Sequence, residues 1–238
     1  MGETAAGQLS FDFGHRPSLS GEDFLIAPCN REAVAWIDRW PDWPSPALAV
    51  FGPAGCGKTH LTRVWQARSG APEINLEMLC GSDPPALLRG AKCCVVEDVG
   101  AGLDDAKSSR AFLHLFNLVA ETRGHMLLTA AAAPSRWPVR FADLRSRLAA
   151  IPAVAVGAPD DALIGALIVK LFTDRQLKVG DEVVSYMLAR MDRSFDAARR
   201  LVAAIDAAAL SRRRNVTVPL VGHIMRGFVA TEDGPEEA

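Results

Sequence analysis

The clearest chemistry in this chain is carried by the run GPAGCGKT at positions 52–59. It matches the pattern G-x-x-x-x-G-K-[ST], in which glycines let the backbone turn its N–H groups around a phosphate. An apolar run at 47–51 precedes it and is typical of a buried parallel strand. Residues 60–68 follow with helical apolar spacing, and a helix N-terminus adds partial positive charge behind the loop. The sequence therefore predicts a phosphate-binding loop for a nucleotide.

Two side chains of this loop have expected roles. Lys58 would reach the β- and γ-phosphates, and the Thr59 hydroxyl would hold Mg²⁺. The residues expected to bind the nucleotide here are Gly52, Pro53, Ala54, Gly55, Cys56, Gly57, Lys58, Thr59 and His60.

A second acidic motif follows the apolar run CCVV at 93–96, which ends in Glu97 and Asp98. Acids at the carboxyl end of a central strand lie in the crevice where open α/β sheets bind ligands. We expect Glu97 to ligate Mg²⁺ directly or through water, and Asp98 to orient an attacking water. The alternative is that both acids are solvent-exposed at a strand end.

Apolar runs and helical patterns alternate along the first two thirds of the chain, which predicts an α/β fold with a parallel sheet covered on both faces. From about residue 159 only helical patterns remain. The expected strands are 47–51, 73–79, 93–96, 125–129 and 151–156; the expected helices are 31–40 (with Asn30 as N-cap), 60–68, 109–122, 160–173, 181–191, 194–210 (with Ser194 as N-cap) and 219–229. The expected domains are a tail at 1–21, an α/β domain at 22–157, a helical domain at 158–230 and an acidic tail at 231–238.

The composition is that of a globular protein and argues against a membrane or secreted protein. The 238 residues are 49% hydrophobic and 23% charged, which is ordinary for a globular protein with a buried core. A net charge of −2 argues against a general polyanion binder. We expect no membrane span and no signal peptide. The five cysteines include no C-x-x-C pair, which favours reduced thiols and a cytoplasmic protein.

The N-terminal segment QLSFDF at 8–13 carries apolar residues in alternation, at Leu9, Phe11 and Phe13. Extended peptides with alternate apolar anchors commonly dock in a groove of another protein. The alternative is an edge strand of the protein's own sheet.

Over about residues 22–228 the chain resembles an AAA+ ATPase of the DnaA branch. The resemblance rests on the phosphate loop, the strand with two acids, the box DLRSRL at 143–148 and the helical lid after it. The segment 23–30 is similar to the part of DnaA that packs around adenine, which implies nucleotide contacts from Leu25, Ile26 and Asn30. The implied cofactors are ADP or ATP with Mg²⁺.

Two features of DnaA are not expected here, its DNA-binding helix-turn-helix domain and its helicase-contact domain. The segment QLSFDF is instead similar to the Q-L-[SD]-L/F-x-L/F peptide that docks bacterial proteins on the replicative sliding clamp. The residues that would bind the clamp are Gln8, Leu9, Ser10, Phe11 and Phe13. The combination resembles the Hda family, the regulatory inactivators of DnaA.

That resemblance implies a mechanism in trans, in which the protein stimulates hydrolysis of DnaA-bound ATP through an arginine finger and so prevents re-initiation. Arg147 is the implied finger, Arg145 is its rival, and the alternative for Arg147 is an intramolecular salt bridge. The implied partners are DnaA and the DNA polymerase III β sliding clamp. The sequence leaves open whether the chain forms a homodimer or oligomer. The implied location is the nucleoid and replisome.

Three departures from DnaA bear on catalysis. Glu97 stands where aspartate is usual, and the run 130–133 offers only alanines where DnaA has a polar sensor. Asp196 falls near the DnaA sensor arginine, which leaves Arg193 or Arg199 as substitutes. These departures predict weak or absent intrinsic ATPase activity, with the nucleotide as a structural element.

Two other functions stay open at this point. One is a DnaA-like initiation or helicase-loading factor that binds DNA or helicase. The other is a self-contained ATPase or kinase in which Lys58, Glu97 and Asp98 perform the chemistry.

Overall fold

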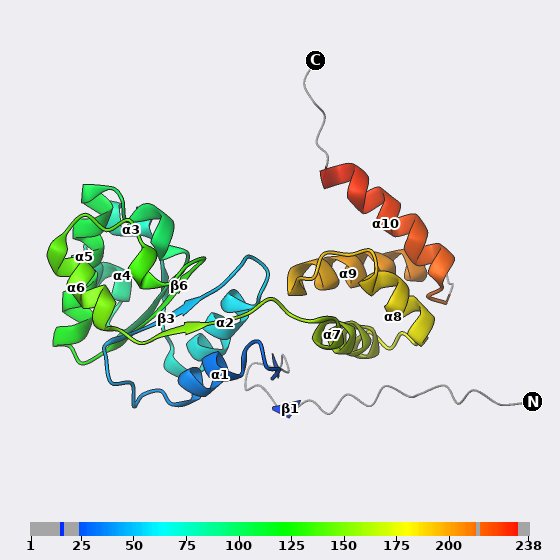
Figure 1. Cartoon of the computed structure of the whole chain (residues 1–238), viewed down its shortest axis with the longest axis horizontal. Coiled ribbons are helices and arrows are strands. Elements are labelled where there is room, and N and C mark those ends of the chain that lie inside the picture. The colour runs from blue at the N-terminus through cyan, green and yellow to red at the C-terminus, as the bar shows by residue number, and fades with distance from the viewer. Residues whose placement is uncertain (1–14, 17–23, 213–214, 233–238) are drawn as a thin grey trace, which may run out of the picture. The chain divides into compact units, whose positions relative to one another are not determined.

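The computed structural model describes residues 15–16, 24–212 and 215–232, so the proposed clamp-binding segment at 8–13 lies outside the described residues. The chain divides into two compact units, of which the first ends at Pro159 and the second begins at Asp160. Figure 1 shows the two units as ribbons, and each unit has its own buried apolar side chains.

The first unit is built on a parallel sheet of five strands in the order β4-β5-β6-β3-β7. The strands are β3 (Ala47–Phe51), β4 (Glu73–Ile74), β5 (Cys93–Val96), β6 (His125–Ala130) and β7 (Ala153–Ala155). A separate small sheet pairs β1 (His15–Arg16) with β2 (Phe24–Leu25). The predicted α/β class with a parallel sheet is confirmed, and the strand before the phosphate loop lies inside the sheet, between β6 and β7.

Helices cover both faces of this sheet (Figure 1). Side chains alternate across each strand: Ala49, Val96 and Leu128 join the cluster that includes residues of α5 and α6, whereas Val50 and Leu127 join the cluster that includes residues of α1 and α2. The helices are α1 (Arg31–Asp38), α2 (Lys58–Ser69), α3 (Leu76–Gly81), α4 (Pro84–Leu88), η1 (Val99–Gly102), α5 (Ala106–Glu121), η2 (Pro134–Arg136) and α6 (Ala142–Ala150).

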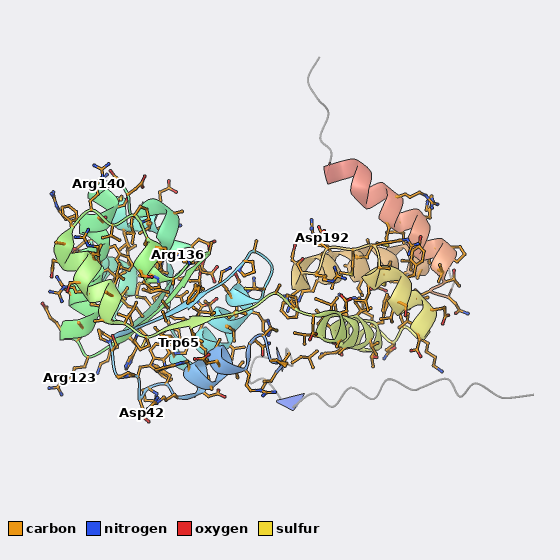
Figure 2. The ribbon with its side chains drawn as sticks, in the orientation of Figure 1. Asp42, Trp65, Arg123, Arg136, Arg140 and Asp192 are labelled. Carbon is orange, nitrogen blue, oxygen red and sulfur yellow. The ribbon has the colours of Figure 1, made fainter. Side chains whose placement is uncertain are left out.

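An aromatic cluster packs against α2 through Trp65. Trp65 of α2 is fully buried and stacks on Trp43 with ring centroids 5.4 Å apart. Trp40 meets Trp65 edge-on at 5.9 Å, and His125 at the start of β6 lies edge-on to Trp43 at 5.5 Å. Figure 2 shows Trp65 inside the α/β unit, whereas Arg123 projects from its surface. The helix that follows the phosphate loop is therefore fixed by large apolar contacts.

Most predicted elements are confirmed within a few residues, but the strand predicted at 73–79 is wrong beyond Ile74. The side-chain Oδ1 of Asn75 accepts a hydrogen bond from the backbone N–H of Met78 at 2.7 Å and caps a helix, α3, over Leu76–Gly81. An asparagine cap satisfies an N–H group that a helix start leaves without a partner, so it favours the helix over the strand.

The first helix begins at Arg31 as predicted but ends two residues earlier than expected. Asn30 occupies the N-cap position of α1, but its side chain makes no capping hydrogen bond. The helix ends at Asp38, so Trp40 lies in the following turn, not on the helical face, and packs on Trp65.

The second unit is entirely helical among its described residues, and the predicted helical lid is confirmed. Its helices are α7 (Asp161–Asp174), α8 (Asp181–Leu188), α9 (Phe195–Arg212) and α10 (Val218–Glu232). Ser194 caps α9 as predicted, because its Oγ accepts from the backbone N–H of Ala197 at 3.1 Å. In the part of the chain that the structure describes, no helix has the length and apolar character needed to cross a membrane.

Candidate nucleotide-binding site

The loop after β3 has a backbone that only glycine suits at several positions. Gly55 and Gly57 have φ angles of 72° and 101°, in the left-handed region that side chains disfavour. At Gly52 a Cβ would lie 2.1 Å from the carbonyl oxygen of Val156, so the loop begins in direct contact with the chain that leaves β7. The Gly52 N–H donates to the carbonyl of Ala130 at 3.1 Å, which ties the loop to the end of β6 as well.

The loop runs directly into α2. Gly57 is the N-cap residue and offers no side-chain cap, so N–H groups at this helix end point toward the loop without a side-chain acceptor. A helix N-terminus of this kind attracts an anion such as a phosphate. Burial raises the pKa of the Cys56 thiol within the loop, so this cysteine stays protonated and acts as a packing group.

Lys58 is held at the loop by two backbone carbonyls. Its Nζ donates to the carbonyl oxygens of Gly52 and Pro53, both at 2.9 Å. The oxygens of a bound phosphate carry negative charge. They would form stronger hydrogen bonds with the Lys58 ammonium than the two carbonyls do.

The carboxylate of Glu97 lies beside the start of α2. The Thr59 hydroxyl donates to Glu97 Oε2 at 3.2 Å, and the Thr62 hydroxyl donates to Glu97 Oε1 at 2.6 Å. Mg²⁺ holds octahedral ligands at 2.0–2.1 Å, so neighbouring ligand oxygens are about 2.9 Å apart. The Thr59 and Glu97 oxygens are 3.2 Å apart, about 0.3 Å more than this, so these two residues could hold the ion after a small adjustment, together with phosphate oxygens and water.

Asp98 adopts an unusual backbone conformation next to this pair. Its φ and ψ angles are 48° and 39°, a left-handed conformation that non-glycine residues adopt at a cost. The Asp98 N–H donates to the Thr129 hydroxyl at 3.1 Å, and Thr129 is buried near the end of β6. Because Thr129 lies opposite Val50 of β3, it connects the second acid to the strand before the loop.

The structure places the hydroxyls of Thr59 and Thr62 at the Glu97 carboxylate, and the backbone N–H of Asp98 at Thr129. Thr62 and Thr129 were not among the predicted site residues. Only the alanines at 130–133 were named from the sequence as the sensor position, whereas Thr129 lies just before them in β6. A threonine near the end of an otherwise apolar strand could have indicated Thr129. The spacing of one helical turn from Thr59 could have indicated Thr62.

The segment proposed to contact adenine has a fixed shape. The buried Asn30 side chain accepts from the Ala27 N–H at 2.9 Å and donates to the Leu25 carbonyl at 3.0 Å. The Gly157 N–H donates to the Cys29 carbonyl at 2.8 Å, and Gly157 directly follows the residue that borders Gly52. The segment is thus at the same end of the sheet as the loop, and Asn30 shapes it from inside while Leu25 and Ile26 stay half-buried.

The implied arginine finger lies on α6, whose buried Leu144 and Leu148 anchor it to the α/β unit. Arg147 is 40% exposed and donates through Nε to Asp143 at 3.1 Å. Within the described residues Asp143 is its only polar partner, so Arg147 is not brought to the loop of its own chain. Arg145 is also exposed on this helix.

The lid arginines make ion pairs inside the helical unit. Arg193 binds both carboxylate oxygens of Asp161, through Nε at 2.5 Å and Nη2 at 3.1 Å, and holds the pKa of that carboxyl below its usual range. Asp196 pairs with Arg200 at 3.0 Å, and Arg199 is half-buried.

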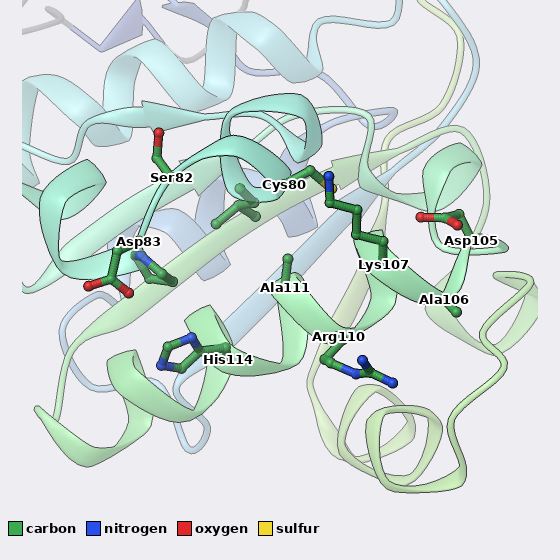
Figure 3. Close-up of a pocket in the computed structure, with 11 residues that line it drawn as sticks. Cys80, Ser82, Asp83, Asp105, Ala106, Lys107, Arg110, Ala111 and His114 are labelled. Carbon is green, nitrogen blue, oxygen red and sulfur yellow. The ribbon is translucent and has the colours of Figure 1, made fainter.

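A groove in the α/β unit lies between α3, α4 and α5, with a volume of about 610 Å³ (Figure 3). Asp83 and Asp105 line it together with Lys107 and Arg110, so its charges are mixed. It contains none of the predicted site residues.

Comparison with known proteins agrees with this geometry. Residues 162–225 match the family model for the Hda lid domain. The fold is similar to domain III of the replication initiation protein DnaA from Thermotoga maritima, with a TM-score of 0.74, 15% identity, and coverage of 86% of this chain and 94% of that one. The lid of this chain is therefore similar to that of the Hda family, and its fold is that of DnaA domain III.

Two further proteins are similar to this chain. An uncharacterized protein from Haemophilus influenzae is 23% identical over 193 residues, which cover 77% of this chain and 83% of the relative. AMPPCP-bound DnaA from Aquifex aeolicus has a TM-score of 0.64 and 18% identity, with coverage of 78% of this chain and 64% of that one. The resemblance inferred from the sequence agrees with the lid match and with the fold.

Proposed function

We propose that this protein is a nucleotide-bound regulator of replication initiation that stimulates hydrolysis of DnaA-bound ATP in trans. The Hda-type lid and the DnaA-like fold support a DnaA-related replication regulator. The observation that carries the finer proposal is Arg147, which is exposed on α6 and, among the described residues, bonded only to Asp143. An arginine with this freedom can enter the site of another protein.

The chemistry required of Arg147 is electrostatic. When water attacks the γ-phosphorus of ATP, the bond to the β–γ bridging oxygen breaks and charge is spread over the phosphoryl oxygens. Arg147 uses only Nε in its bond to Asp143, so both Nη groups are free of partners in the described part of the chain. A guanidinium fork pointed at the γ-phosphate forms charge-assisted hydrogen bonds that stabilise this transition state.

The protein's own nucleotide, ADP or ATP with Mg²⁺, has a structural role in this proposal. The loop from Gly52 to Thr59 would cradle its phosphates, Lys58 would contact them, and Thr59 with Glu97 would hold the ion. A sensor role for Arg193 would require it to leave Asp161. Arg199 is the other lid arginine proposed to approach the nucleotide.

The segment at 8–13 supplies the proposed tether to the DNA polymerase III β sliding clamp. A single short peptide binds weakly, with an affinity on the order of micromolar or about −8 kcal/mol. Tethering raises the local concentration of Arg147 near DNA-bound DnaA, so hydrolysis depends on loaded clamp more than on affinity between the two ATPases.

The test is hydrolysis of ATP bound to purified DnaA, measured with this protein, with and without clamp loaded on DNA. We expect stimulation that requires loaded clamp at low protein concentration. The double variant Gln8→Ala/Leu9→Ala should need a much higher concentration for the same rate, because only the tether is lost. If the wild-type protein gives no stimulation at any concentration with loaded clamp, the proposal is wrong, and binding to helicase or single-stranded DNA becomes the next measurement.

A further inference from the structure

We propose that Thr62 is a positioning residue of the metal–nucleotide site, which orients Glu97 so that a single carboxylate oxygen faces Mg²⁺. The inference rests on the proposed binding of nucleotide with Mg²⁺ at the loop. It assigns a role to a residue outside the phosphate-loop pattern, one helical turn beyond Thr59.

Both oxygens of the Glu97 carboxylate are bonded to hydroxyl groups of the same helix, α2. Thr62 Oγ1 lies 2.6 Å from Oε1, and Thr59 Oγ1 lies 3.2 Å from Oε2. The Thr62 bond is the shorter of the two and has the length of a charge-assisted O–H···O⁻ hydrogen bond. Thr62 is 1% exposed, so its hydroxyl is shielded from water, whereas Thr59 is exposed at the mouth of the loop.

The two carboxylate oxygens therefore have different roles. Oε1 is fixed by the buried hydroxyl of Thr62. Oε2 contacts the Thr59 hydroxyl, which is the group expected to share the ion. The carboxylate therefore cannot rotate to present its other oxygen without breaking the buried hydrogen bond, and a fixed ligand binds a metal more tightly than a mobile one.

The pairing depends on the length of the glutamate at position 97. An aspartate there would be shorter by one methylene. The longer side chain brings the carboxylate to the second turn of α2, where Thr62 can reach it, and adds a rotatable bond whose freedom must be restrained. Thr62 supplies that restraint.

A purely structural role for Thr62 must be separated from this one. Threonines in helices often donate to a carbonyl in the preceding turn, and Thr62 Oγ1 is also 2.8 Å from the Thr59 carbonyl. The hydroxyl has one proton for these two acceptors. If the carbonyl were its functional partner, loss of the hydroxyl would change the stability of the fold and leave metal binding unaffected.

The experiment measures ADP binding by calorimetry in Mg²⁺ and in EDTA, for the full chain and its Thr62→Val and Thr62→Ser variants. We expect Thr62→Val to reduce the gain in ADP affinity that Mg²⁺ provides by roughly 10-fold or more, as loss of a group behind a metal ligand does. Affinity in EDTA should stay at the wild-type value, and Thr62→Ser should retain the Mg²⁺ effect. The matched control is Ser109→Ala, which removes a buried hydroxyl that donates to the Leu103 carbonyl at 2.6 Å in α5.

A second variant series keeps the proposal testable if Thr62→Val folds poorly. In a Glu97→Asp background the carboxylate no longer reaches Thr62, so adding Thr62→Val should cause no further loss of the Mg²⁺ effect. Equal losses in both backgrounds, or a Thr62→Val variant that behaves like Ser109→Ala, would overturn the proposal. A wild-type protein that binds ADP with the same affinity in Mg²⁺ and EDTA would overturn it as well. Absence of ADP binding in both conditions would instead overturn the nucleotide-binding proposal on which it rests.

Discussion

The phosphate loop and the arginine of α6 are constructed in opposite ways. At the loop, Lys58 is bonded to two carbonyls and Glu97 to two threonines. On α6, Arg147 has one exposed ion pair. A site that holds its own ligand is preorganised within its chain, whereas a group that acts on another protein must stay accessible and receive its final geometry from that partner. Substitutions in the two regions should therefore change different measurements.

The largest expected effect is that of Arg147→Ala on hydrolysis of DnaA-bound ATP. An arginine finger supplied in trans contributes roughly 10³–10⁵ in rate, so stimulation should fall by at least about 10³-fold. Affinity of the variant for its own ADP should not change, because Arg147 makes no polar contact with the loop. Arg147→Lys should restore little, since lysine lacks the bidentate fork.

Arg145→Ala is the matched control for that experiment, because Arg145 is an exposed arginine on the same helix. It should stimulate hydrolysis like the wild-type protein. The reverse result, with Arg145 required and Arg147 dispensable, would transfer the proposed role to Arg145 and leave the contrast between loop and helix intact. If Arg147→Ala weakened ADP binding as well, that contrast would be wrong.

The second effect concerns the stability of the loop. Gly52→Ala puts a Cβ 2.1 Å from a backbone carbonyl oxygen, which cannot move without shifting β7. We expect a loss of about 1–3 kcal/mol in the free energy of unfolding, measured by urea denaturation, together with weaker ADP binding. Gly81→Ala is the control: a Cβ there meets no atom within 4 Å, and alanine is favoured over glycine in a helix. Equal stability of the two variants would contradict this view of the loop.

The third effect separates affinity from stability in the same loop. Lys58→Ala should weaken ADP binding by about 30-fold, which corresponds to about 2 kcal/mol, because a charged hydrogen bond to phosphate is lost. Its thermal stability should change little, since the two carbonyls that Lys58 contacts can be solvated. Lys107→Ala in the groove beside α5 removes the same side chain at a distance from the loop and should leave ADP affinity unchanged.

Local sequence was sufficient to predict most of the fold. The apolar runs at 47–51 and 93–96 form strands because each is short, continuous and buried on both faces, and the glycine pattern fixes the loop between strand and helix. The strand predicted at 73–79 failed because the Asn75 cap, a single local hydrogen bond, outweighed an alternating pattern.

The contacts that complete the site were beyond sequence reasoning. Thr62 and Glu97 are 35 residues apart, and Asp98 and Thr129 are 31 apart. Each pair meets because neighbouring strands share a register and α2 packs over one of them, and no local pattern encodes that register. The left-handed backbone of Asp98 has the same origin, since Thr129 from the adjacent strand accepts its N–H.

The fourth effect concerns the aromatic cluster of Trp40, Trp43 and Trp65 that packs against α2, and tests whether it needs a neutral His125. Burial lowers the pKa of His125, which lies edge-on to Trp43 and Trp40, so the fold favours the neutral imidazole. Stability should be complete above the ordinary histidine pKa of about 6.5 and should decline as the pH falls through and below that value. The decline should be smaller than the loss in Gly52→Ala, and His125→Gln should flatten it. His114→Gln, which changes an exposed histidine of the groove, should not.

The smallest expected effect bears most directly on the α6 arginine. Asp143→Ala removes the only polar partner of Arg147 among the described residues, in an ion pair exposed on both sides. Exposed pairs one helical turn apart contribute about 0.3–0.5 kcal/mol, so unfolding should barely change. Stimulation of hydrolysis should be retained or modestly increased, because Arg147 no longer has to leave Asp143 to reach a phosphate. A loss as large as that of Arg147→Ala would mean that Asp143 must hold the guanidinium in place. In that case the α6 arginine would be preorganised like the loop, and its accessibility would not be what distinguishes it.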